Sequence, residues 1–519
     1  MASLNLAPGD SALGIQDAKR QFSDGRYSAC LNACEAMTQV AGTEREAALV
    51  LKARALTRIG RPAEAIAALA AELSEFADPL TRLEGDAQLA LAEASLNDFP
   101  SAEATLAGLN SETLGRAPLV IRSELEYIEA LVAWMKGDLT HAEAVLRRSQ
   151  DQSPLAAGKR VMLHSWVAAK REHYADQVRL MLDGVEIVRR AETPDVGLLA
   201  GAARIVCNMA REISRPGLTR SASELYESIA WTEDLAVEHF NAARTLGWAL
   251  ALQGNDNYLE SLRLLHRATA LSPTPAWKVW GLLDRAAMKR YAGERSSSSA
   301  DLYEALELIK DVRWGETLDE ERTGLLYAAE LFAPVDLSEA SALLAQFSQI
   351  SEAFSPRLAL RGDRRLDAAR AYSTGVVQQA LGDNRKARQF FESAYTVYKE
   401  IGYRWRAART ALHLYEVTRD AKWHEAAREQ IHDYPQSWIA SDIREASSGV
   451  GDDGWNRLTP RQREVFNALC EGMTAKRIAD RLQCSPNTVR NHIHWIYQAF
   501  RVESQPALIT EARKRKLIS

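Results

Sequence analysis

The chain has 519 residues, which is too long for a single hydrophobic core, so we expect two to four structural units. Apolar residues make up 46% and charged residues 26% of the sequence, and the mean hydropathy is −0.27. These values are those of an ordinary soluble protein and exclude a disordered chain or an integral membrane protein. The formal net charge of −5 is unevenly distributed along the chain, as counted below.

The N-terminal segment and the cysteines favour a cytoplasmic protein. Residues 1–19 lack the basic-then-apolar pattern of a signal peptide, and no run of about 18 apolar residues could span a membrane. Five cysteines without metal-ligand spacing fit a reducing compartment. Cys30 and Cys34 lie one helical turn apart, but the sequence offers no further ligands near them. We therefore predict no metal site and no membrane contact.

The sequence from Leu13 to Tyr434 has the pattern of paired helices. It is rich in Ala, Leu, Glu and Arg, and Gly, Asn or Pro interrupts it about every 15 to 20 residues. Several turn residues are followed five positions later by an alanine, which would let the second helix of a pair approach the first. These combinations are Gly60 with Ala65, Asn97 with Ala102, Gly137 with Ala142, and Gly382 with Ala387.

Residues 369–395 resemble a tetratricopeptide repeat most clearly. The repeat positions are occupied by Gly375, Gly382, Ala387, Phe391 and Ala394. Turns at residues 25, 60, 97 and 137 are 35, 37 and 40 residues apart, so these repeats are longer than the standard unit of about 34 residues. We predict that residues 1–440 form a superhelical array of tetratricopeptide-like helix pairs with a concave side.

The concave side of such an array is a candidate binding groove for an effector. In the repeat register above, the inward-facing first-helix positions are Asn241, Arg244, Trp248, Trp280 and Arg290. Aromatic rings with guanidinium groups and an amide suit a peptide, a carboxylate or an acidic segment of another protein. The alternative is that the tryptophans belong to the core and the arginines to a solvated face.

No residue pattern indicates catalysis or a cofactor. Gly158 and Lys159 are followed by arginine and lack the upstream glycine of a phosphate-binding loop. His424 lacks the second histidine, four residues on, of a zinc protease helix, because Arg428 stands there. We therefore predict that the chain is not an enzyme, and that its signal enters through the helical repeats.

The C-terminal end differs from the body in charge. Residues 441–456 hold the densest cluster of Gly, Ser and Asp, and they are predicted to form a flexible linker. From Arg457 to Ser519 there are 12 Lys and Arg against 5 Asp and Glu, a net charge of +7, so residues 1–456 carry −12 of the total. A basic end on an acidic body is typical of a nucleic-acid-binding domain joined to a part that avoids nucleic acid.

Cap residues predict three short helices in this basic end, and a fourth is expected over about Gln505 to Leu517. Thr459, Thr474 and Ser485 are placed as N-caps, and Gly472 suits the left-handed end of the first helix. In the third helix, apolar residues recur at spacings of 4, 3 and 4 and form one buried stripe, Val489, Ile493, Ile496 and Phe500. The opposite face and its flanks hold no carboxylate and suit base edges and phosphates, with Asn487, Thr488, Arg490, Asn491, His492, His494, Trp495 and Gln498.

These residues resemble the DNA-binding domain of LuxR-type (GerE-type) bacterial transcription regulators, over about an eighth of the chain. The family pattern is met by Leu458, Thr459, Arg461, Glu464, Val465, Gly472, Met473, Thr474, Lys476, Ile478, Ala479, Ser485, Thr488, Val489, Arg490 and His492. The resemblance implies base reading by Arg490, Asn491 and His494. It implies phosphate contacts by Thr488, His492 and Lys476, beside which Arg477 adds a positive charge.

Three positions depart from the family pattern. Arg477 replaces a glutamate that would complete a capping box with Thr474, so this helix start loses some stability. Arg501 replaces a glycine after the third helix, which changes the expected turn. Gln505 replaces a common arginine, so a phosphate contact or salt bridge expected there is missing.

In the family, the fourth helix forms the dimer contact. By resemblance, this places Leu508, Ile509 and Ala512 in the interface of a homodimer on DNA, with half-sites in successive major grooves. The alternative is that Leu508 and Ile509 pack on Phe500 and Val465 of their own domain.

The sequence thus predicts an all-α protein in three parts: a repeat domain over residues 1–440, a linker over 441–456 and a helix-turn-helix domain over 457–519. The expected partners are double-stranded DNA, a second copy of the chain, and an unidentified protein, peptide or small-molecule effector. The alternative function is a repeat-based interaction scaffold whose C-terminal bundle is a docking module.

Overall fold

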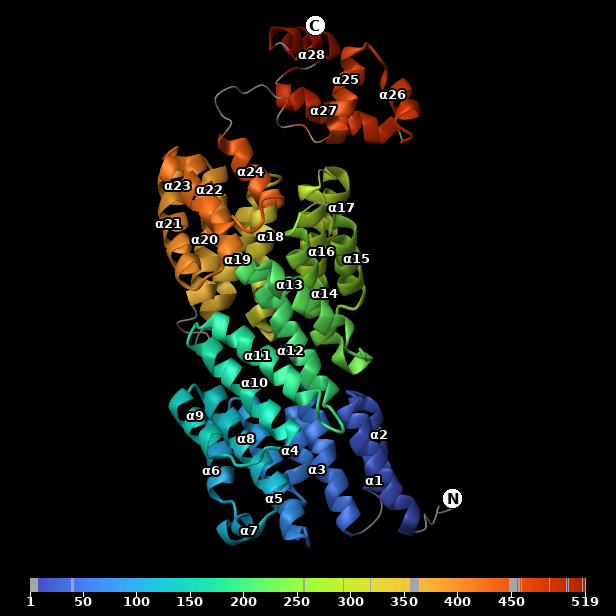
Figure 1. Ribbon diagram of the computed structural model, residues 1–519, viewed down its shortest axis with the longest axis vertical. Coiled ribbons are helices and arrows are strands. Elements are labelled where there is room, and N and C mark those ends of the chain that lie inside the picture. Colours follow the sequence, from blue (N-terminus) through green and yellow to red (C-terminus); the bar gives the residue numbers. More distant parts are fainter. Residues whose placement is uncertain are drawn as a thin grey trace. The chain divides into compact units, whose positions relative to one another are not determined.

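The computed structural model describes residues 8–38, 42–254, 257–292, 294–317, 319–354, 364–447, 455, 458, 460–484, 486–500, 502, 504–515 and 517–518. Within these ranges every regular element is a helix (Figure 1). The chain divides into two compact units. Unit 1 comprises Met1–Ala249 with Ala270–Pro273, and unit 2 comprises Leu250–Thr269 with Thr274–Ser519.

Unit 1 is an array of helix pairs. Its α-helices are α1 (Pro8–Ser23), α2 (Tyr27–Met37), α3 (Thr43–Arg58), α4 (Pro62–Ala70), α5 (Pro79–Ser95), α6 (Phe99–Ala107), α7 (Ser111–Arg116), α8 (Leu119–Lys136), α9 (Leu139–Arg148), α10 (Pro154–Lys170), α11 (Tyr174–Val188), α12 (Val196–Met209), α13 (Pro216–Glu227) and α14 (Ala236–Ala251). Short 3₁₀ turns lie at Leu73–Glu75 and Glu233–Leu235, and a buried π-helical turn at Ala210–Ser214 follows α12.

The turns between paired helices have the predicted conformation. Gly60 and Gly137 adopt left-handed backbone angles, with φ of 78° and 94°, and Asn97 has φ of 62°. The alanines five positions after them, Ala65, Ala102 and Ala142, are completely buried. Glycine adopts such angles without the steric cost that a side chain brings, which explains its use at these sharp turns.

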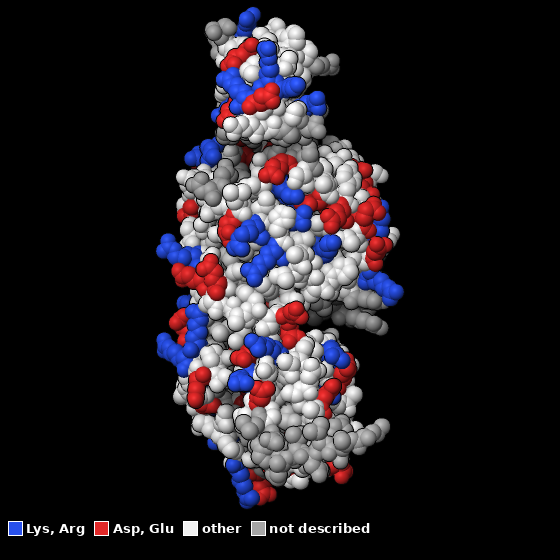
Figure 2. Space-filling model, turned by 90° about the vertical axis from the view of Figure 1, so that its right-hand side faces the viewer, with Lys and Arg blue, Asp and Glu red and all other residues white. Residues whose placement is uncertain are grey.

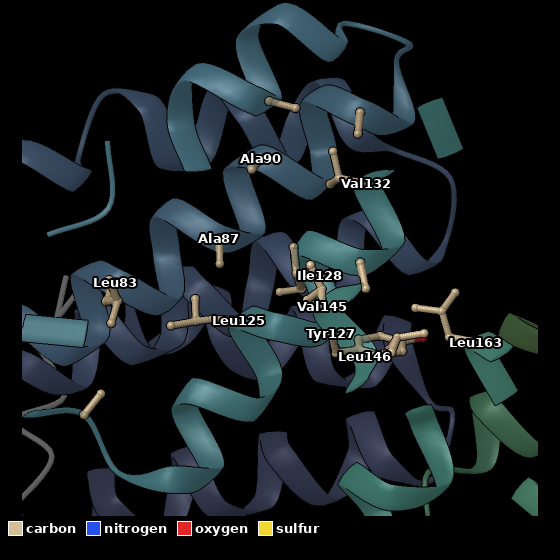
Figure 3. Close-up of a cluster of buried hydrophobic side chains, with 14 residues drawn as sticks. Leu83, Ala87, Ala90, Leu125, Tyr127, Ile128, Val132, Val145, Leu146 and Leu163 are labelled. Atoms are coloured by element: carbon tan, nitrogen blue, oxygen red, sulfur yellow. The ribbon is translucent and has the colours of Figure 1, made fainter. Parts of the chain in front are cut away.

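The first helices of successive pairs share one hydrophobic core, drawn in Figure 3. Leu83, Ala87 and Ala90 of α5 lie beside residues of α8 such as Leu125 and Ile128, and α9 and α10 extend the cluster. Alanines on α5 leave room for the larger side chains of α8. Each buried leucine or isoleucine contributes about 1.5 to 3 kcal/mol relative to an exposed one.

Helices α10 and α11 approach each other closely through two glycines. A Cβ atom on Gly158 would lie 2.4 Å from Val188 Cγ2, and one on Gly184 would lie 2.6 Å from Met162 Cγ. Gly158 and Lys159 are therefore interior residues of a packed helix, and they do not form a phosphate-binding loop.

Unit 2 continues the pattern and ends in four further helices. Its α-helices are α15 (Tyr258–Ala270), α16 (Pro275–Tyr291), α17 (Arg295–Asp311), α18 (Asp319–Phe332), α19 (Leu337–Phe354), α20 (Arg364–Ala380), α21 (Asn384–Glu400), α22 (Arg404–Thr418), α23 (Ala421–Gln430), α24 (Trp438–Ser447), α25 (Pro460–Cys470), α26 (Ala475–Arg481), α27 (Pro486–Phe500) and α28 (Gln505–Lys514). A 3₁₀ turn lies at Trp314–Glu316.

The clearest tetratricopeptide-like pair is α20 with α21, as predicted. Gly382 forms the left-handed turn with φ of 81°, and Ala387 is completely buried. A Cβ atom on Gly375 would lie 2.6 Å from Cε1 of Phe391, so this glycine lets the Phe391 ring pack against the backbone of α20.

Helix α24 follows the last pair and extends beyond the predicted domain end at residue 440. It runs to Ser447 because Ile439 and Ile443 are buried, at 0% and 1% exposure. Residues 441–447, predicted to belong to the linker, are therefore helical, and residues 448–454 lie outside the described ranges. Among the residues described, no helix is long and apolar enough to cross a membrane.

Candidate nucleic-acid interface

Helices α25 to α28 have a hydrophobic core of their own. Its buried members are Leu458, Val465, Phe466, Ala468, Leu469, Ile478, Ala479, Val489, Ile496, Phe500, Leu508 and Ala512. The Phe466 and Phe500 rings stack with centroids 5.0 Å apart, and the Trp455 ring meets Phe466 edge-on at 5.1 Å. Trp455 was predicted to be a linker residue, but it packs on this core.

The turn between α25 and α26 leads into the helix-turn-helix, which α26 and α27 form. Gly472 has φ of 82°, and the Met473 N–H donates to the Ala468 carbonyl at 3.0 Å, so α25 ends as predicted. The Thr474 hydroxyl accepts from the Arg477 backbone N–H at 3.5 Å, which is a long capping contact. The predicted N-caps Thr459 and Ser485 lie outside the described residues.

Helix α27 buries the predicted apolar stripe. Val489, Ile496 and Phe500 are at most 1% exposed, and Ile493 is half-buried. The opposite side of α27 therefore faces away from the core of the domain. Arg490 is exposed there, whereas His492 is half-buried. The side chains of the other predicted contact residues, Thr488, Asn491 and His494, lie outside the described residues, as do those of Asn487, Trp495 and Gln498.

Two further cations lie on the first turn of α26, which packs against α27. Lys476 and Arg477 are exposed, and neither forms an ion pair within the described part of the chain. Arg481 at the end of the same helix is different, because it pairs with Glu471 at 2.6 Å. On the face shown in Figure 2, basic and acidic side chains are interspersed over the helical body.

The dimer contact predicted on α28 is wrong for two of its three residues. Leu508 and Ala512 are completely buried in the core that contains Val465 and Phe500, so they are not available to a second copy. The alternative interpretation, packing within the domain, is confirmed for Leu508. Ile509 is half-buried and retains some accessible surface.

Gln505 has a role that the sequence comparison did not reveal. Its side-chain Nε2 donates to the Leu469 carbonyl at 2.7 Å and to the Met473 carbonyl at 3.3 Å. Carbonyls at a helix end lack partners within their own helix. The glutamine therefore links the start of α28 to the end of α25.

The predicted groove on the repeat body is wrong for its first three residues. Asn241, Arg244 and Trp248 of α14 are 6%, 6% and 2% exposed, so they are interior residues of unit 1. Helical spacing alone does not distinguish a residue that faces the groove from a residue in the core. The low exposure of these three side chains shows that they belong to the core. Trp280 and Arg290 of α16 belong to unit 2 and are half-buried.

A buried charge cluster on the first helices of unit 1 was not predicted. Lys159 Nζ lies 2.7 Å from Glu124 Oε2, Arg54 Nη2 lies 3.0 Å from Glu124 Oε1, and Arg58 Nη2 lies 3.5 Å from Asp195 Oδ2. Burial alone would raise the pKa of Glu124, but Lys159 and Arg54 outweigh it and lower this pKa to about 2. We call these five residues the unit 1 charge cluster.

Comparison with known proteins identifies the C-terminal domain. Residues 456–512 match the family of bacterial regulatory proteins described as the luxR family. The spore germination protein GerE of Bacillus subtilis is 43% identical over 54 residues, which cover 10% of this chain and 73% of GerE. Rv0890c of Mycobacterium tuberculosis, named as an HTH-type transcriptional regulator, is 40% identical over 62 residues, or 12% of this chain. That match spans only 7% of the length of Rv0890c.

Structural similarity over the helical body is weak. The apo form of the quorum sensor NprR from B. thuringiensis is aligned with 70% of this chain and 100% of its own, at 13% identity and a TM-score of 0.43. A score of this size supports no conclusion about function. GerE, in contrast, is matched over most of its length by residues that form the helix-turn-helix described above. The chain therefore belongs to the LuxR family of bacterial regulatory proteins.

Proposed function

We propose that this protein is a sequence-specific DNA-binding transcription regulator whose helical repeat body receives a signal from a protein, peptide or small-molecule partner. The observation that carries the proposal is the exposed side of α26 and α27. Lys476, Arg477 and Arg490 are exposed there, on a domain whose core holds the opposite side of α27. Cations in such an arrangement suit phosphates and base edges, and Arg490 stands at a base-reading position by resemblance to the family.

The remaining contacts belong to the same proposal. Asn491 and His494 join Arg490 in reading bases, and Thr488 and His492 join Lys476 and Arg477 in contacting phosphates. Two copies would bind one roughly palindromic site in the cytoplasm. Ile509 is the residue of the predicted α28 contact that keeps accessible surface for the second copy.

Selection of bound fragments from a genomic DNA pool by the full-length protein, followed by gel shifts on the enriched sequence, tests the proposal. We expect Arg490→Ala to weaken binding to the enriched sequence by about 1 to 3 kcal/mol and to relax preference at one base position. Arg388→Ala is the matched control, because Arg388 lies exposed on α21 in an ion pair with Glu392. Equal binding by the wild type and Arg490→Ala would contradict the assigned role of Arg490.

Salt dependence separates this function from a docking module. A dimer that contacts about six to ten phosphates loses about 10³- to 10⁵-fold in affinity for DNA when the salt concentration rises from 50 to 200 mM. An apolar protein contact changes little over that range. No enrichment of DNA, or binding that salt does not weaken, would overturn the proposed function in favour of an interaction scaffold.

A further inference from the structure

One amide side chain joins both sides of the turn between α25 and α26. Gln505, the first residue of α28, is half-buried, and its Nε2 donates to the Leu469 carbonyl at 2.7 Å and to the Met473 carbonyl at 3.3 Å. Leu469 lies in the last turn of α25, and Met473 directly precedes Thr474, the N-cap of α26. Only the NH2 side of the amide can face two carbonyls, because the amide oxygen accepts hydrogen bonds and does not donate them. Gln505 therefore connects the end of α25 to the start of α26.

The start of α26 is weakly held by its own residues. The Thr474 hydroxyl accepts from the Arg477 N–H at 3.5 Å, beyond the usual range of about 2.7 to 3.2 Å. Arg477 also places a positive charge in the first turn, where the partial positive charge of the helix start favours anions. Further along, Ile478 and Ala479 are 0% and 1% exposed and fix α26 in the core of the domain. The first turn of α26 thus depends on a contact from outside the helix, which Gln505 supplies.

This first turn carries the two cations that we assign to DNA phosphates. Lys476 and Arg477 are exposed, and neither forms an ion pair within the described ranges. A charge-assisted hydrogen bond to a phosphate oxygen spans only about 2.7 to 2.9 Å, so its strength depends on where the helix start lies. A displaced helix start forces the long side chains into less favourable rotamers if they are to reach the same phosphates. We therefore expect a movement of the first turn to weaken the phosphate contacts without abolishing them.

Gln505 is not required to hold its own helix in place. Leu508 and Ala512 of α28 are completely buried in the core of the domain. The Leu469 carbonyl also accepts from the Gly472 N–H at 2.9 Å, so it keeps a partner when the Gln505 side chain is removed. Removal of the amide therefore leaves a folded domain in which the start of α26 is less firmly held.

We propose that Gln505 is a positioning residue for DNA binding, which holds the first turn of α26 so that Lys476 and Arg477 meet their phosphates. Both amide hydrogens of Gln505 are used within the protein, so it acts without touching DNA. The inference rests on the proposed function, because it assumes that these two cations contact phosphates. It predicts a specific defect in a Gln505 variant, namely fewer phosphates neutralised with the base preference of Arg490 unchanged.

The salt dependence of DNA binding tests the inference. The affinity of the full-length protein for the enriched sequence is measured at several salt concentrations, and the slope of log affinity against log salt reports the number of phosphates neutralised. Gln505→Met keeps the length of the side chain and removes both donors. We expect it to bind about 10-fold more weakly at about 100 mM salt and to reduce the slope by about 1. Thr510→Ala, at an exposed position of α28, is the control and should match the wild type.

A double-mutant cycle separates positioning from other roles of Gln505. In a protein that already carries Lys476→Ala and Arg477→Ala, Gln505→Met should cause no further loss of affinity, because the contacts that it positions are gone. A residue that contacts DNA itself, or whose loss loosens the whole domain, would lower affinity by the same factor in both backgrounds. The preference at the base position assigned to Arg490 should be the same in the wild type and in Gln505→Met.

Hydrogen exchange measured without DNA gives an independent test. Deuterium uptake is followed by mass spectrometry in the full-length protein, over residues 473–478 at the start of α26 and over residues 463–469 in α25. We expect Gln505→Met to speed exchange at the start of α26 by about 10-fold and to leave α25 unchanged. Gln505→Lys keeps N–H donors at this position and should exchange like the wild type. Circular dichroism and the melting temperature establish folding, and Gln505→Ala takes the place of Gln505→Met if the latter does not fold.

Three outcomes would overturn the inference: an unchanged salt slope in folded Gln505→Met, the same loss of affinity with and without Lys476 and Arg477, or unchanged exchange at the start of α26. Absence of DNA binding by the wild type would instead reject the proposed function. Faster exchange in Gln505→Met would in that case still establish that Gln505 holds the start of α26.

Discussion

Two glutamates on first helices of the repeat pairs, one in each unit, have opposite electrostatic surroundings. Glu124 in unit 1 lies within 3.0 Å of both Lys159 and Arg54, and its pKa falls to about 2. Glu330 in unit 2 accepts a hydrogen bond from Ser373, and burial raises its pKa. The cation beside it, Arg409, is held by aromatic rings instead of carboxylates.

The difference separates charges that ion pairs balance from a charge on α22 that aromatic rings surround. The unit 1 charge cluster satisfies its own members, and removal of one leaves another buried without a partner. Arg409 contacts the rings of Tyr291, Tyr372 and Trp438 and forms no ion pair among the described residues, although Glu330 and Asp442 lie near enough to act on its charge. Stability measurements should therefore respond strongly to changes in the unit 1 charge cluster and weakly to changes in Arg409 or Glu330.

The largest effect is expected from Glu124→Gln. The substitution leaves the Lys159 side chain, which is 4% exposed, without its carboxylate, and breaking a buried pair costs about 3 kcal/mol. The urea midpoint followed by circular dichroism should fall accordingly. Glu103→Gln is the control, since Glu103 pairs with Lys136 at an exposed position and should cost less than about 0.5 kcal/mol. Equal midpoints in both variants would remove the distinction drawn above.

Acid should affect the two glutamates in opposite directions. The pKa of Glu124 in the folded protein, about 2, is below its value of about 4.3 in an unfolded chain, so its contribution is complete above about pH 5 and is lost as the pH falls toward 2. The full loss amounts to about 3 kcal/mol. The raised pKa of Glu330 means that its charged form opposes folding, and protonation on acidification relieves this cost.

Urea midpoints measured from pH 7 to pH 3 check this prediction. The difference in stability between the wild type and Glu124→Gln should shrink as the pH falls. A constant difference would show that Glu124 keeps an ordinary pKa in the folded protein.

A smaller effect is expected from Arg409→Met. Three cation–π contacts are lost, each worth about 0.5 to 1 kcal/mol, but a half-buried cation that forms no ion pair among the described residues is also removed. We expect a net cost of about 1 kcal/mol in urea unfolding. A cost as large as that of Glu124→Gln would show that the charge of Arg409 stabilises the fold as strongly as the unit 1 charge cluster does.

The smallest effect is expected from Glu330→Gln. Glutamine can still accept from Ser373, and it removes a carboxylate whose charged form is disfavoured by burial. Stability at pH 7 should stay within about 0.5 kcal/mol of the wild type. A loss of more than about 2 kcal/mol would show that Glu330 forms a stabilising ion pair, as Glu124 does.

Features set by local sequence were predictable. A left-handed glycine followed by a small residue specifies the turn of a helix pair, as at Gly137 and Gly382, because both constraints act within a few residues. The buried stripe of α27 was readable because its period matches the helix. For Trp248 the helical period allowed two interpretations, a groove residue or a core residue, because both recur with the same spacing along a helix.

Features that join distant segments were not predictable. Glu124 meets Arg54 from 70 positions away and Lys159 from 35, and no local spacing links them. The rings around Arg409 come from three other helices for the same reason. Gln505 was expected to remove a contact, but its side chain reaches a carbonyl 36 positions earlier in the sequence, where only the folded domain brings the two together.

The burial of Leu508 and Ala512 has a consequence for how such a protein responds to its own abundance. With both residues inside the domain, α28 offers a second copy little apolar area, so pairing in free solution would be weak. The duplex itself would then align the two domains on adjacent half-sites. If two copies bind one operator, as proposed, its occupancy far below saturation would rise roughly with the square of the free protein concentration.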